Sequence, residues 1–292
     1  MDKTPAAEAS IGESQAEEIL HGGNTSVVVR VGDTVRRHTG RWTPAVHGLL
    51  AHLTSVGFAD APTVQGIDEQ GRAVLSFVTG EVGSFDPGGL PDWFRTIEAC
   101  VAIGDWLRRF HEAQSGFTPD LALPWRMVPG RRLTAGEVVV HHDAAPYNTI
   151  RRPDGGLTVI DWDFCAPGDP IEDLAFACWS WAPLWNDRAA VESEFCDGSV
   201  EASAARLGAL VGAYGLEPED RLRLLPAIQA IMYAHAKDLE RLAVQGDPAF
   251  VKLFDSGVAD RARRDAAWVC DNEAVLSAAM RGDFGHMAQV RH

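Results

Sequence analysis

The strongest constraint on this chain is the stretch from residue 138 to residue 175, VVVHHDAAPYNTIRRPDGGLTVIDWDFCAPGDPIEDLA. It contains two short apolar runs, residues 138–140 and residues 157–160. Between them lies the sequence PDGG at 153–156, and aspartate and glycine tolerate the positive φ angles of a tight turn. The pattern predicts that the two runs are strands of one hairpin, each ending at polar residues.

Those polar residues have the chemistry of phosphoryl transfer. His141, Asp143 and Asn148 follow the first run, and Asp161 and Asp163 follow the second. A carboxylate such as Asp143 can accept a proton from a hydroxyl nucleophile or orient it. The oxygens of Asn148 and Asp161 suit Mg²⁺, which prefers oxygen ligands and bridges to substrate phosphates, and Asp163 is a further metal or water ligand. Phosphoryl transfer needs little beyond such a metal, a base and cations.

The alternative is a solvated loop, because aspartate, asparagine and histidine are common in turns. A lone H-x-D would favour that alternative. Here the full spacing H-x-D-x-x-x-x-N is followed by IDWD and then by G-D-P-x-x-D-L-A. The combination favours a catalytic site.

With these motifs the chain resembles the aminoglycoside-phosphotransferase-like small-molecule kinases, relatives of the protein kinases. The resemblance implies that Asp143 is the catalytic residue, that His141 positions its loop and that Asp173 braces the loop. It implies that Asn148 and Asp161 hold Mg²⁺. The APYN sequence and the N-terminal VRVGDTVRR…WTPAVHGLL most resemble a branch often labelled trifolitoxin-immunity-like phosphotransferases.

The same resemblance implies a nucleotide site in the first 80 residues. Gly22 and Gly23 would form the glycine-rich loop over the phosphates, although a plain hairpin turn accounts for them equally well. Backbone groups from Ser76 to Val78 would meet the adenine. The strand at 35–37 would carry the cation that contacts the α- and β-phosphates.

That cation is expected to be arginine. Lysine occurs only at positions 3, 237 and 252, and none of these lies on the strand. We expect Arg36 to face the nucleotide and keep Arg37 as the alternative, because adjacent strand residues face opposite sides. Many relatives pair the cation with a glutamate on the following helix. No glutamate or aspartate occurs between Gly40 and Ala59, and either Val46 or His47 falls near the expected place.

Hydrophobic periodicity predicts the helices. The spacing of Val46, Leu49, Leu50 and Leu53 predicts a helix over 44–53. A second helix is expected over 91–114, with Asp92 as its cap. Further helices are expected over the ranges 169–185, 200–214, 220–244 and 248–279. Asp238 and Glu240 are candidates to line a pocket for a cationic acceptor, and a solvated helix face is the competing interpretation.

Composition narrows the partners. A net charge of −15 argues against nucleic acid and anionic membranes and suits a cationic substrate. No apolar run reaches the roughly 18 residues that a transmembrane helix needs, and the first residues lack the pattern of a secretory signal. The five scattered cysteines are typical of buried apolar residues in a reducing compartment, so we expect a cytoplasmic protein.

Together these features predict an α+β, bilobal, protein-kinase-like fold, with a small antiparallel sheet lobe and a mainly helical lobe. We divide the chain into a flexible tail (1–14), a nucleotide lobe (15–79), a hinge (80–89) and a helical lobe (90–292). The expected reaction uses Mg²⁺ and ATP or GTP to phosphorylate a small-molecule hydroxyl, with an aminoglycoside or other antibiotic as the first candidate acceptor. A metabolic kinase for a sugar or amino alcohol and a non-catalytic protein that sequesters a compound are the alternatives. The acceptor, the nucleotide preference and the oligomeric state are left open.

Overall fold

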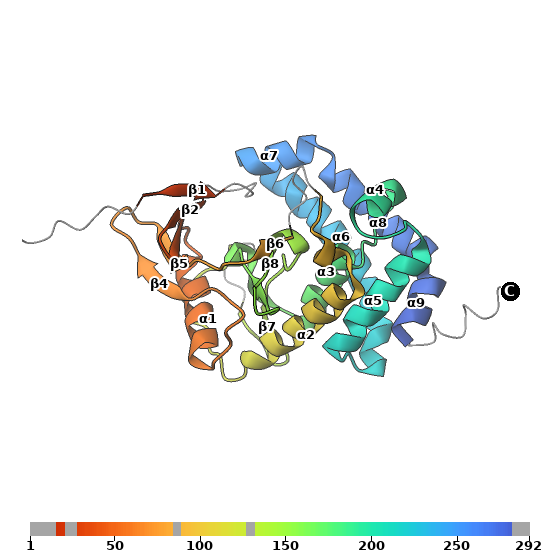
Figure 1. Ribbon diagram of the computed structural model, residues 1–292, viewed down its shortest axis with the longest axis horizontal. Helices are drawn as coiled ribbons and strands as arrows, with labels where there is room; N and C mark the ends of the chain where they lie inside the picture. Colours follow the sequence, from red (N-terminus) through yellow and green to blue (C-terminus); the bar gives the residue numbers. More distant parts are fainter. Residues whose placement is uncertain (1–15, 21–27, 84–88, 127–131, 282–292) are drawn as a thin grey trace, which may run out of the picture.

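The computed structural model describes residues 16–20, 28–83, 89–126 and 132–281. The expected tail at 1–14 and the pair Gly22 and Gly23 lie outside the described residues. The described chain forms a small sheet lobe and a larger lobe made mainly of helices (Figure 1). The predicted α+β, two-lobe architecture is confirmed.

The small lobe is a five-stranded antiparallel sheet with the strand order β1-β2-β3-β5-β4. Its strands are β1 (Glu18–Leu20), β2 (Val28–Val31), β3 (Thr34–Arg37), β4 (Val64–Ile67) and β5 (Ala73–Ser76). Gly32 has a φ of 59°, which lets the chain turn between β2 and β3 at little steric cost. Helix α1 (Thr43–Ser55) contacts β4 and buries the apolar stripe that predicted it.

The passage between the lobes lies directly against the candidate catalytic loop. Strand β6 (Glu81–Val82) pairs with β8 (Thr149–Arg151) of the second lobe. At Gly83, the next residue, an added Cβ would overlap the carbonyl oxygen of Pro146. This residue must therefore be glycine for the connecting segment to approach the loop so closely.

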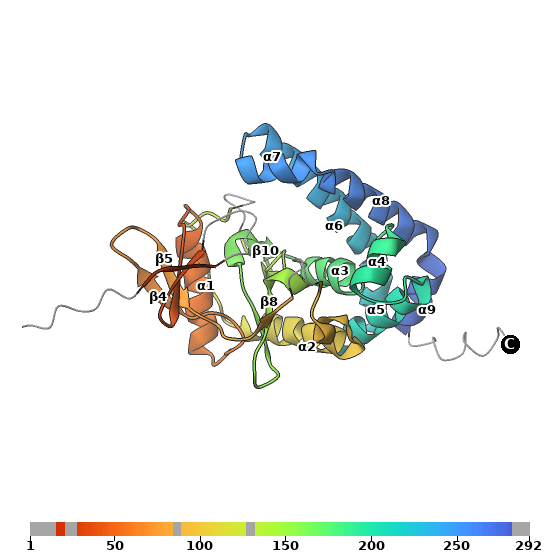
Figure 2. The same cartoon turned by 45° about the horizontal axis from the view of Figure 1, so that its top comes forward.

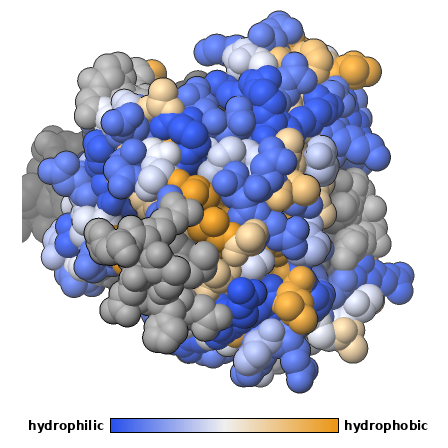
Figure 3. All heavy atoms as spheres, turned by 90° about the vertical axis from the view of Figure 1, so that its right-hand side faces the viewer, coloured by the Kyte–Doolittle hydropathy of each residue, from blue (hydrophilic) through white to orange (hydrophobic). Residues whose placement is uncertain are grey.

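The second lobe contains most of the helices. In the described chain they are α2 (Ile97–Ala113), α3 (Pro170–Trp181), α4 (Arg188–Glu194), α5 (Val200–Tyr214), α6 (Pro218–Val244), α7 (Pro248–Asp255), α8 (Val258–Asp271) and α9 (Glu273–Arg281). Both cartoon views place α6, α7 and α8 along one side of α3 (Figures 1 and 2). The face shown in Figure 3 is mainly hydrophilic, with apolar side chains in separate small patches at its centre, towards its lower right and at its upper right edge.

Three predicted helices are shorter than expected, and the one predicted over 169–185 is α3, which ends at Trp181. Residues 92–95 form a separate 3₁₀ turn, and α2 begins only after Thr96, whose hydroxyl accepts a hydrogen bond from the Ala99 amide at 3.3 Å. Thr96, not Asp92, is therefore the cap of α2. The helix predicted over 248–279 is three helices. Gly257, with a φ of 79°, separates the first two, since a left-handed residue ends the regular hydrogen bonding.

The predicted hairpin pairs the wrong strands. Strand β7 (Val138–Val140) pairs with β10 (Ala166–Gly168), and β9 (Leu157–Val159) pairs with β8. The turn at 153–156 therefore joins β8 to β9. The sequence did not reveal β8 because TIR is a short run beside the catalytic motif, and strand partners depend on tertiary contacts.

One hydrophobic core extends from α1 through α2 to the helices of the second lobe. Its aromatic centre lies beneath the candidate catalytic loop, where Trp106, Phe110 and Trp162 contact one another. Arg206 is buried in the same lobe and donates hydrogen bonds to four backbone carbonyls. Across the described ranges, no helix is long and apolar enough to cross a membrane.

Candidate functional site

The candidate catalytic loop begins where β7 ends, and the buried carboxylate of Asp173 holds its backbone. One oxygen of Asp173 accepts a hydrogen bond from the His141 amide and the other accepts one from the His142 amide, both at 2.7 Å. Burial alone would raise the pKa of Asp173, but the hydrogen bond from His111 and the neighbouring histidines outweigh it, so this pKa is lowered. Asp173 is therefore an anion that fixes the loop, in the bracing position that the motif implied.

His141 lies beneath the loop, and not in the space that a substrate could reach. Its side chain is fully buried and contacts the ring of Trp162 edge-on, with 4.7 Å between ring centroids. The Asp143 amide lies 3.3 Å from its Nδ1 and donates to it. Burial lowers the pKa of His141 to about 4, so it is a neutral acceptor for the loop backbone at physiological pH. This is a positioning role.

His142, which the sequence analysis did not single out, has a φ of 64°. A non-glycine residue in this left-handed region costs about 1–2 kcal/mol. Its Nε2 lies 3.2 Å from Glu172 on α3. Burial lowers the pKa of His142, but Glu172 and Asp173 more than compensate, so it is raised overall. The only sign of His142 in the sequence was that it is the second of two consecutive histidines before Asp143.

Asp143 is placed by two side-chain donors. The Tyr147 hydroxyl donates to Oδ1 at 2.7 Å, and the Asn148 amide nitrogen donates to Oδ2 at 2.8 Å. Removal from solvent raises the pKa of Asp143 to about 7, against the lowering effect of these two hydrogen bonds. A carboxylate with this pKa can exchange a proton with a substrate near neutral pH.

Arg37 is the cation that reaches the site from the small lobe. Its Nη2 lies 2.6 Å from Asp161 and 3.5 Å from Asp163. Burial would raise the pKa of Asp161, but the charge and hydrogen bond of Arg37 lower it instead. Arg126 approaches Asp163 at 3.8 Å and stacks against Trp42 and other rings. The site thus places two cations beside two carboxylates.

Our preference for Arg36 is corrected by this geometry. Arg36 faces the other side of β3, where it donates to Thr34 and lies 3.6 Å from Asp68. Adjacent residues of a strand point to opposite faces, so only one of the two arginines can reach Asp161. That residue is Arg37, the alternative in the sequence analysis.

Asn148 and Asp161 come together because their strands are paired. The Ile160 amide donates to the Asn148 carbonyl at 2.8 Å, which places Asp161 beside the loop. Asp161 itself has a φ of 64°. No cluster of three or more His, Cys, Asp or Glu residues suited to a metal occurs in the described ranges. One carboxylate and one amide oxygen fit Mg²⁺, which usually takes its remaining ligands from water and phosphates.

In the segment expected to bind adenine, residues 76–78, some of the hydrogen-bonding groups are already used within the sheet lobe. The Ser76 amide donates to the Thr63 carbonyl and the Ser76 hydroxyl accepts from the Thr63 amide, both at 2.9 Å. Ser76 therefore uses its amide within the small lobe, and Val78 stays as the candidate for a nucleotide contact.

His47 lies on α1, where many relatives carry a glutamate. Burial lowers the pKa of His47, against the opposite influence of Asp163.

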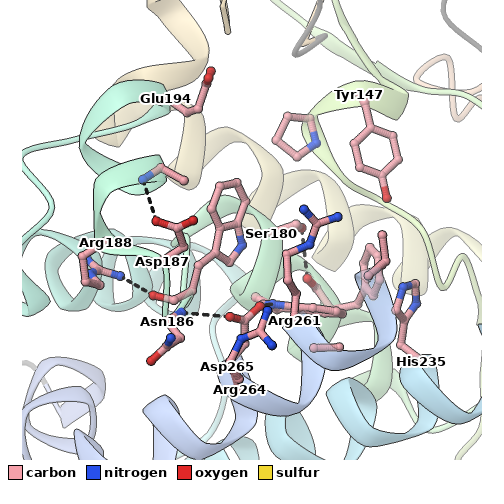
Figure 4. Close-up of a pocket in the computed structure, with 17 residues that line it drawn as sticks. Tyr147, Ser180, Asn186, Asp187, Arg188, Glu194, His235, Arg261, Arg264 and Asp265 are labelled. Carbon is pink, nitrogen blue, oxygen red and sulfur yellow. Dashed lines mark hydrogen bonds between the residues drawn. The ribbon is translucent and has the colours of Figure 1, made fainter. Parts of the chain in front are cut away.

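A cavity of about 860 Å³ adjoins the catalytic loop (Figure 4). Tyr147 borders it on the loop, Phe176 and Trp179 border it on α3, and His235 and Arg261 border it on α6 and α8. The Tyr147 hydroxyl donates to Asp143, so this carboxylate is one hydrogen bond away from a side chain that lines the cavity. Tyr147 was within the quoted motif, but its role is evident only from its contact.

The pocket candidates Asp238 and Glu240 do not line this cavity. Asp238 pairs with Arg241 on the same helix, and Glu240 pairs with Arg263. The alternative interpretation of a charged, solvated helix face therefore describes them better. The predicted burial of the cysteines holds for Cys100, Cys165 and Cys178, whereas Cys270 is exposed.

Comparison with known proteins gives concordant results. Residues 30–225 match the model of the phosphotransferase enzyme family. The chain is 38% identical over 208 residues to a trifolitoxin immunity protein of Rhizobium leguminosarum bv. trifolii, covering 70% of this chain and 76% of that protein. Among solved structures it is similar to a choline/ethanolamine kinase family protein from Mesorhizobium loti, with a TM-score of 0.61, 17% identity and coverage of 93% and 94%. It is also similar to an amicoumacin kinase in complex with AMP-PNP, Ca²⁺ and Ami, with a TM-score of 0.58, 11% identity and coverage of 84% and 88%.

Proposed function

The chain belongs to the phosphotransferase enzyme family, and from this premise we propose that it transfers the γ-phosphoryl group of ATP or GTP to a hydroxyl group of a small molecule. The observation that carries the proposal is the position of Asp143. One oxygen of its carboxylate accepts a hydrogen bond from Tyr147, which lines the cavity, and the other accepts one from the side-chain nitrogen of Asn148. The charge of Asp161 also acts on this carboxylate. Phosphoryl transfer requires an acceptor and a nucleotide on two sides of such a residue.

Each group has a role in this proposal. Asp143 accepts a hydrogen bond from the acceptor hydroxyl and takes its proton as the oxygen attacks the γ-phosphorus. The bond from the γ-phosphorus to the β,γ-bridging oxygen breaks, and ADP or GDP leaves. Asn148 and Asp161 would hold Mg²⁺, which would neutralise phosphate charge, and Asp163 is the further ligand. Arg37 supplies a positive charge at the same place and can bind phosphate oxygens with its guanidinium. His141 and Asp173 keep the loop in position.

Three functions are candidates for this protein, and protection against an antibiotic or toxin is the first. The similarity to a trifolitoxin immunity protein supports an antibiotic or toxin as the acceptor, so that phosphorylation would give resistance. A metabolic sugar or amino-alcohol kinase is the second candidate, because the same catalytic residues would serve it. Sequestration without catalysis is the third, but it gives no reason for a carboxylate whose pKa is about 7 beside the cavity.

The test is Mg²⁺-dependent consumption of ATP and of GTP with a panel of antibiotics, nucleosides, sugars and amino alcohols. We expect a compound-dependent rate and a phosphorylated product identified by mass spectrometry. Asp143→Asn should reduce turnover at least a thousandfold, by about 4 kcal/mol of transition-state stabilisation, while nucleotide binding persists. Asp154→Asn, at the exposed turn between β8 and β9, is the matched control. Undiminished turnover in Asp143→Asn would remove this residue from the mechanism.

A further inference from the structure

The cavity beside Asp143 is not an acidic pocket, although the chain as a whole carries a charge of −15. Its charged lining consists of three carboxylates, Asp187, Glu194 and Asp265, and three arginines, Arg188, Arg261 and Arg264. Several ammonium groups on one ligand would need an excess of carboxylates. The charges of this lining balance, so the negative charge of the protein lies elsewhere.

Two of the three carboxylates already serve the protein. Asp187 caps α4 by accepting a hydrogen bond from the Ala190 amide at 3.1 Å. Asp265 accepts from the Trp179 indole at 3.0 Å and from the Asn186 amide at 2.8 Å. Burial raises the pKa of Asp265 above its usual value.

Glu194 is the remaining carboxylate. One of its oxygens is buried and has no hydrogen-bond partner among the described residues. It lies at the end of the cavity away from His235 (Figure 4). A single carboxylate can accept one hydrogen bond from a ligand hydroxyl or amine, but it does not make a surface for a polycation.

Of the three arginines, only one is used by the protein within the described ranges, and two are left for a ligand. Arg188 is used by the protein, because its guanidinium donates hydrogen bonds to the carbonyls of Gly198 and Ser199 and to the Ser203 hydroxyl. Arg261 and Arg264 are exposed, and no hydrogen bond or ion pair joins either side chain to another residue in the parts of the chain that the structure describes. Both act electrostatically on Asp265, so their charges reach the cavity. Figure 4 shows Arg261 extending from α8 into the cavity.

The remaining lining includes a cluster of aromatic rings. The Trp179 ring lies 5.3 Å from that of His235 and 5.9 Å from that of Phe176, and Trp185 borders the same cavity. Burial lowers the pKa of His235 to about 4, so this imidazole is neutral at physiological pH. A volume of about 860 Å³ accommodates a drug-sized molecule.

We infer that the acceptor is an amphipathic organic anion, a hydroxyl-bearing molecule with an aromatic or apolar body and a carboxylate group. The body contacts Trp179 and its aromatic neighbours, Arg261 and Arg264 bind the carboxylate, and the hydroxyl approaches Asp143 beside Tyr147. This inference rests on the proposed function, since it takes the cavity as the acceptor site. It replaces the polycationic aminoglycoside that the net charge suggested.

The test compares three probes that share an indole ring and a hydroxyl group but differ in charge. Indole-3-lactate carries a carboxylate, tryptophol is neutral and tryptophanol carries an ammonium group. Their binding to the full chain is measured by calorimetry without nucleotide. We expect indole-3-lactate to bind about tenfold more tightly than tryptophol, as charge-assisted hydrogen bonds imply, and tryptophanol to bind most weakly.

The arginine dependence is measured in the double variant Arg261→Gln and Arg264→Gln. It should bind indole-3-lactate and tryptophol equally. The control is Arg263→Gln, on the same helix, whose arginine pairs with Glu240 and Asp260 and does not line the cavity. It should retain the tenfold preference, and unchanged circular dichroism would show that both variants fold.

Tighter binding of tryptophanol, equal binding of all three probes, or a preference for the acid that survives in the double variant would overturn the inference. None of these results bears on phosphoryl transfer, which the nucleotide-consumption panel measures separately. Phosphorylation of a cationic acceptor would overturn the inferred substrate class and leave the kinase proposal standing. If the acid binds in an arginine-dependent way but no compound is turned over, the kinase proposal is overturned, and the cavity's preference for an organic anion stands.

Discussion

Replacing Tyr147 with phenylalanine should shift the pH dependence of phosphoryl transfer to higher pH. The Tyr147 hydroxyl donates to Asp143 at 2.7 Å and stabilises the ionised carboxylate, so its loss raises the pKa of Asp143 above about 7. A hydrogen bond to a charged group contributes about 1.5–3 kcal/mol. Tyr147 is 43% exposed, so water replaces part of this interaction. We therefore expect the loss of this hydrogen bond to destabilise the ionised carboxylate by about 1 kcal/mol, which raises its pKa by roughly 0.7 of a unit.

The assay is the pH profile of kcat/KM with an acceptor identified by the panel. Activity rises as Asp143 loses its proton, so the midpoint of this rise should move upward in Tyr147→Phe and stay in place in Tyr233→Phe. Tyr233 is also exposed, at 52%, and does not line the cavity. A carbon-13 NMR titration of the Asp143 carboxyl group gives the same pKa without turnover. A midpoint that is unmoved, or that moves to lower pH, would refute the reasoning.

Three further predictions follow from the contacts of the site and the linker. Arg37→Gln should weaken binding of Mg²⁺ and AMP-PNP at least tenfold by calorimetry, whereas Arg36→Gln, on the opposite face of β3, should change it little; equal effects would contradict the observed facing. Asp173→Asn should lower the free energy of unfolding by about 2 kcal/mol in urea, because one loop amide loses its acceptor. Since the pKa of Asp173 is lowered from 3.8, this contribution is present above that pH and is lost as the pH falls through the folded-state value, so wild type and variant should converge in acid. Gly83→Ala should destabilise the protein by about 1–3 kcal/mol, because its Cβ overlaps Pro146, whereas Gly212→Ala, in the open surroundings of a helix, should stabilise it by about 0.5–1 kcal/mol in thermal unfolding.

The local chemistry of the site was predictable because it lies in one short segment. The spacing H-x-D-x-x-x-x-N places Asp143 and Asn148 on the same loop, and their side chains are hydrogen-bonded in the structure. Asp173 follows 30 residues later and binds the loop backbone. The apolar stripe of α1 was equally readable, since helical periodicity is a local property.

The break at Thr96 and the division of residues 248–279 into three helices were not recovered. Apolar periodicity continues across such points, because each successive helix still buries an apolar side: α7 in a small cluster with α6, α9 in the main core, and α8 in both. The caps that end them are single residues, and many serine, threonine and glycine residues occur where no helix begins or ends. Helix boundaries are therefore less well determined by the sequence than helix positions.

The sequence alone determined the loop that carries Asp143 and the positions of the main helices, because these depend on spacing along the chain and on hydrophobic periodicity, and the resemblance carried by the loop motif implied the two-lobe fold. Only the tertiary structure decided which arginine reaches Asp161, which strand pairs with β7, and what charge lines the cavity. Arg37 is separated from Asp161, and Tyr147 from Arg261, by more than a hundred residues. Such neighbours are brought together by strand facing and by helix packing, which depend on burial summed over the whole chain rather than on any local pattern.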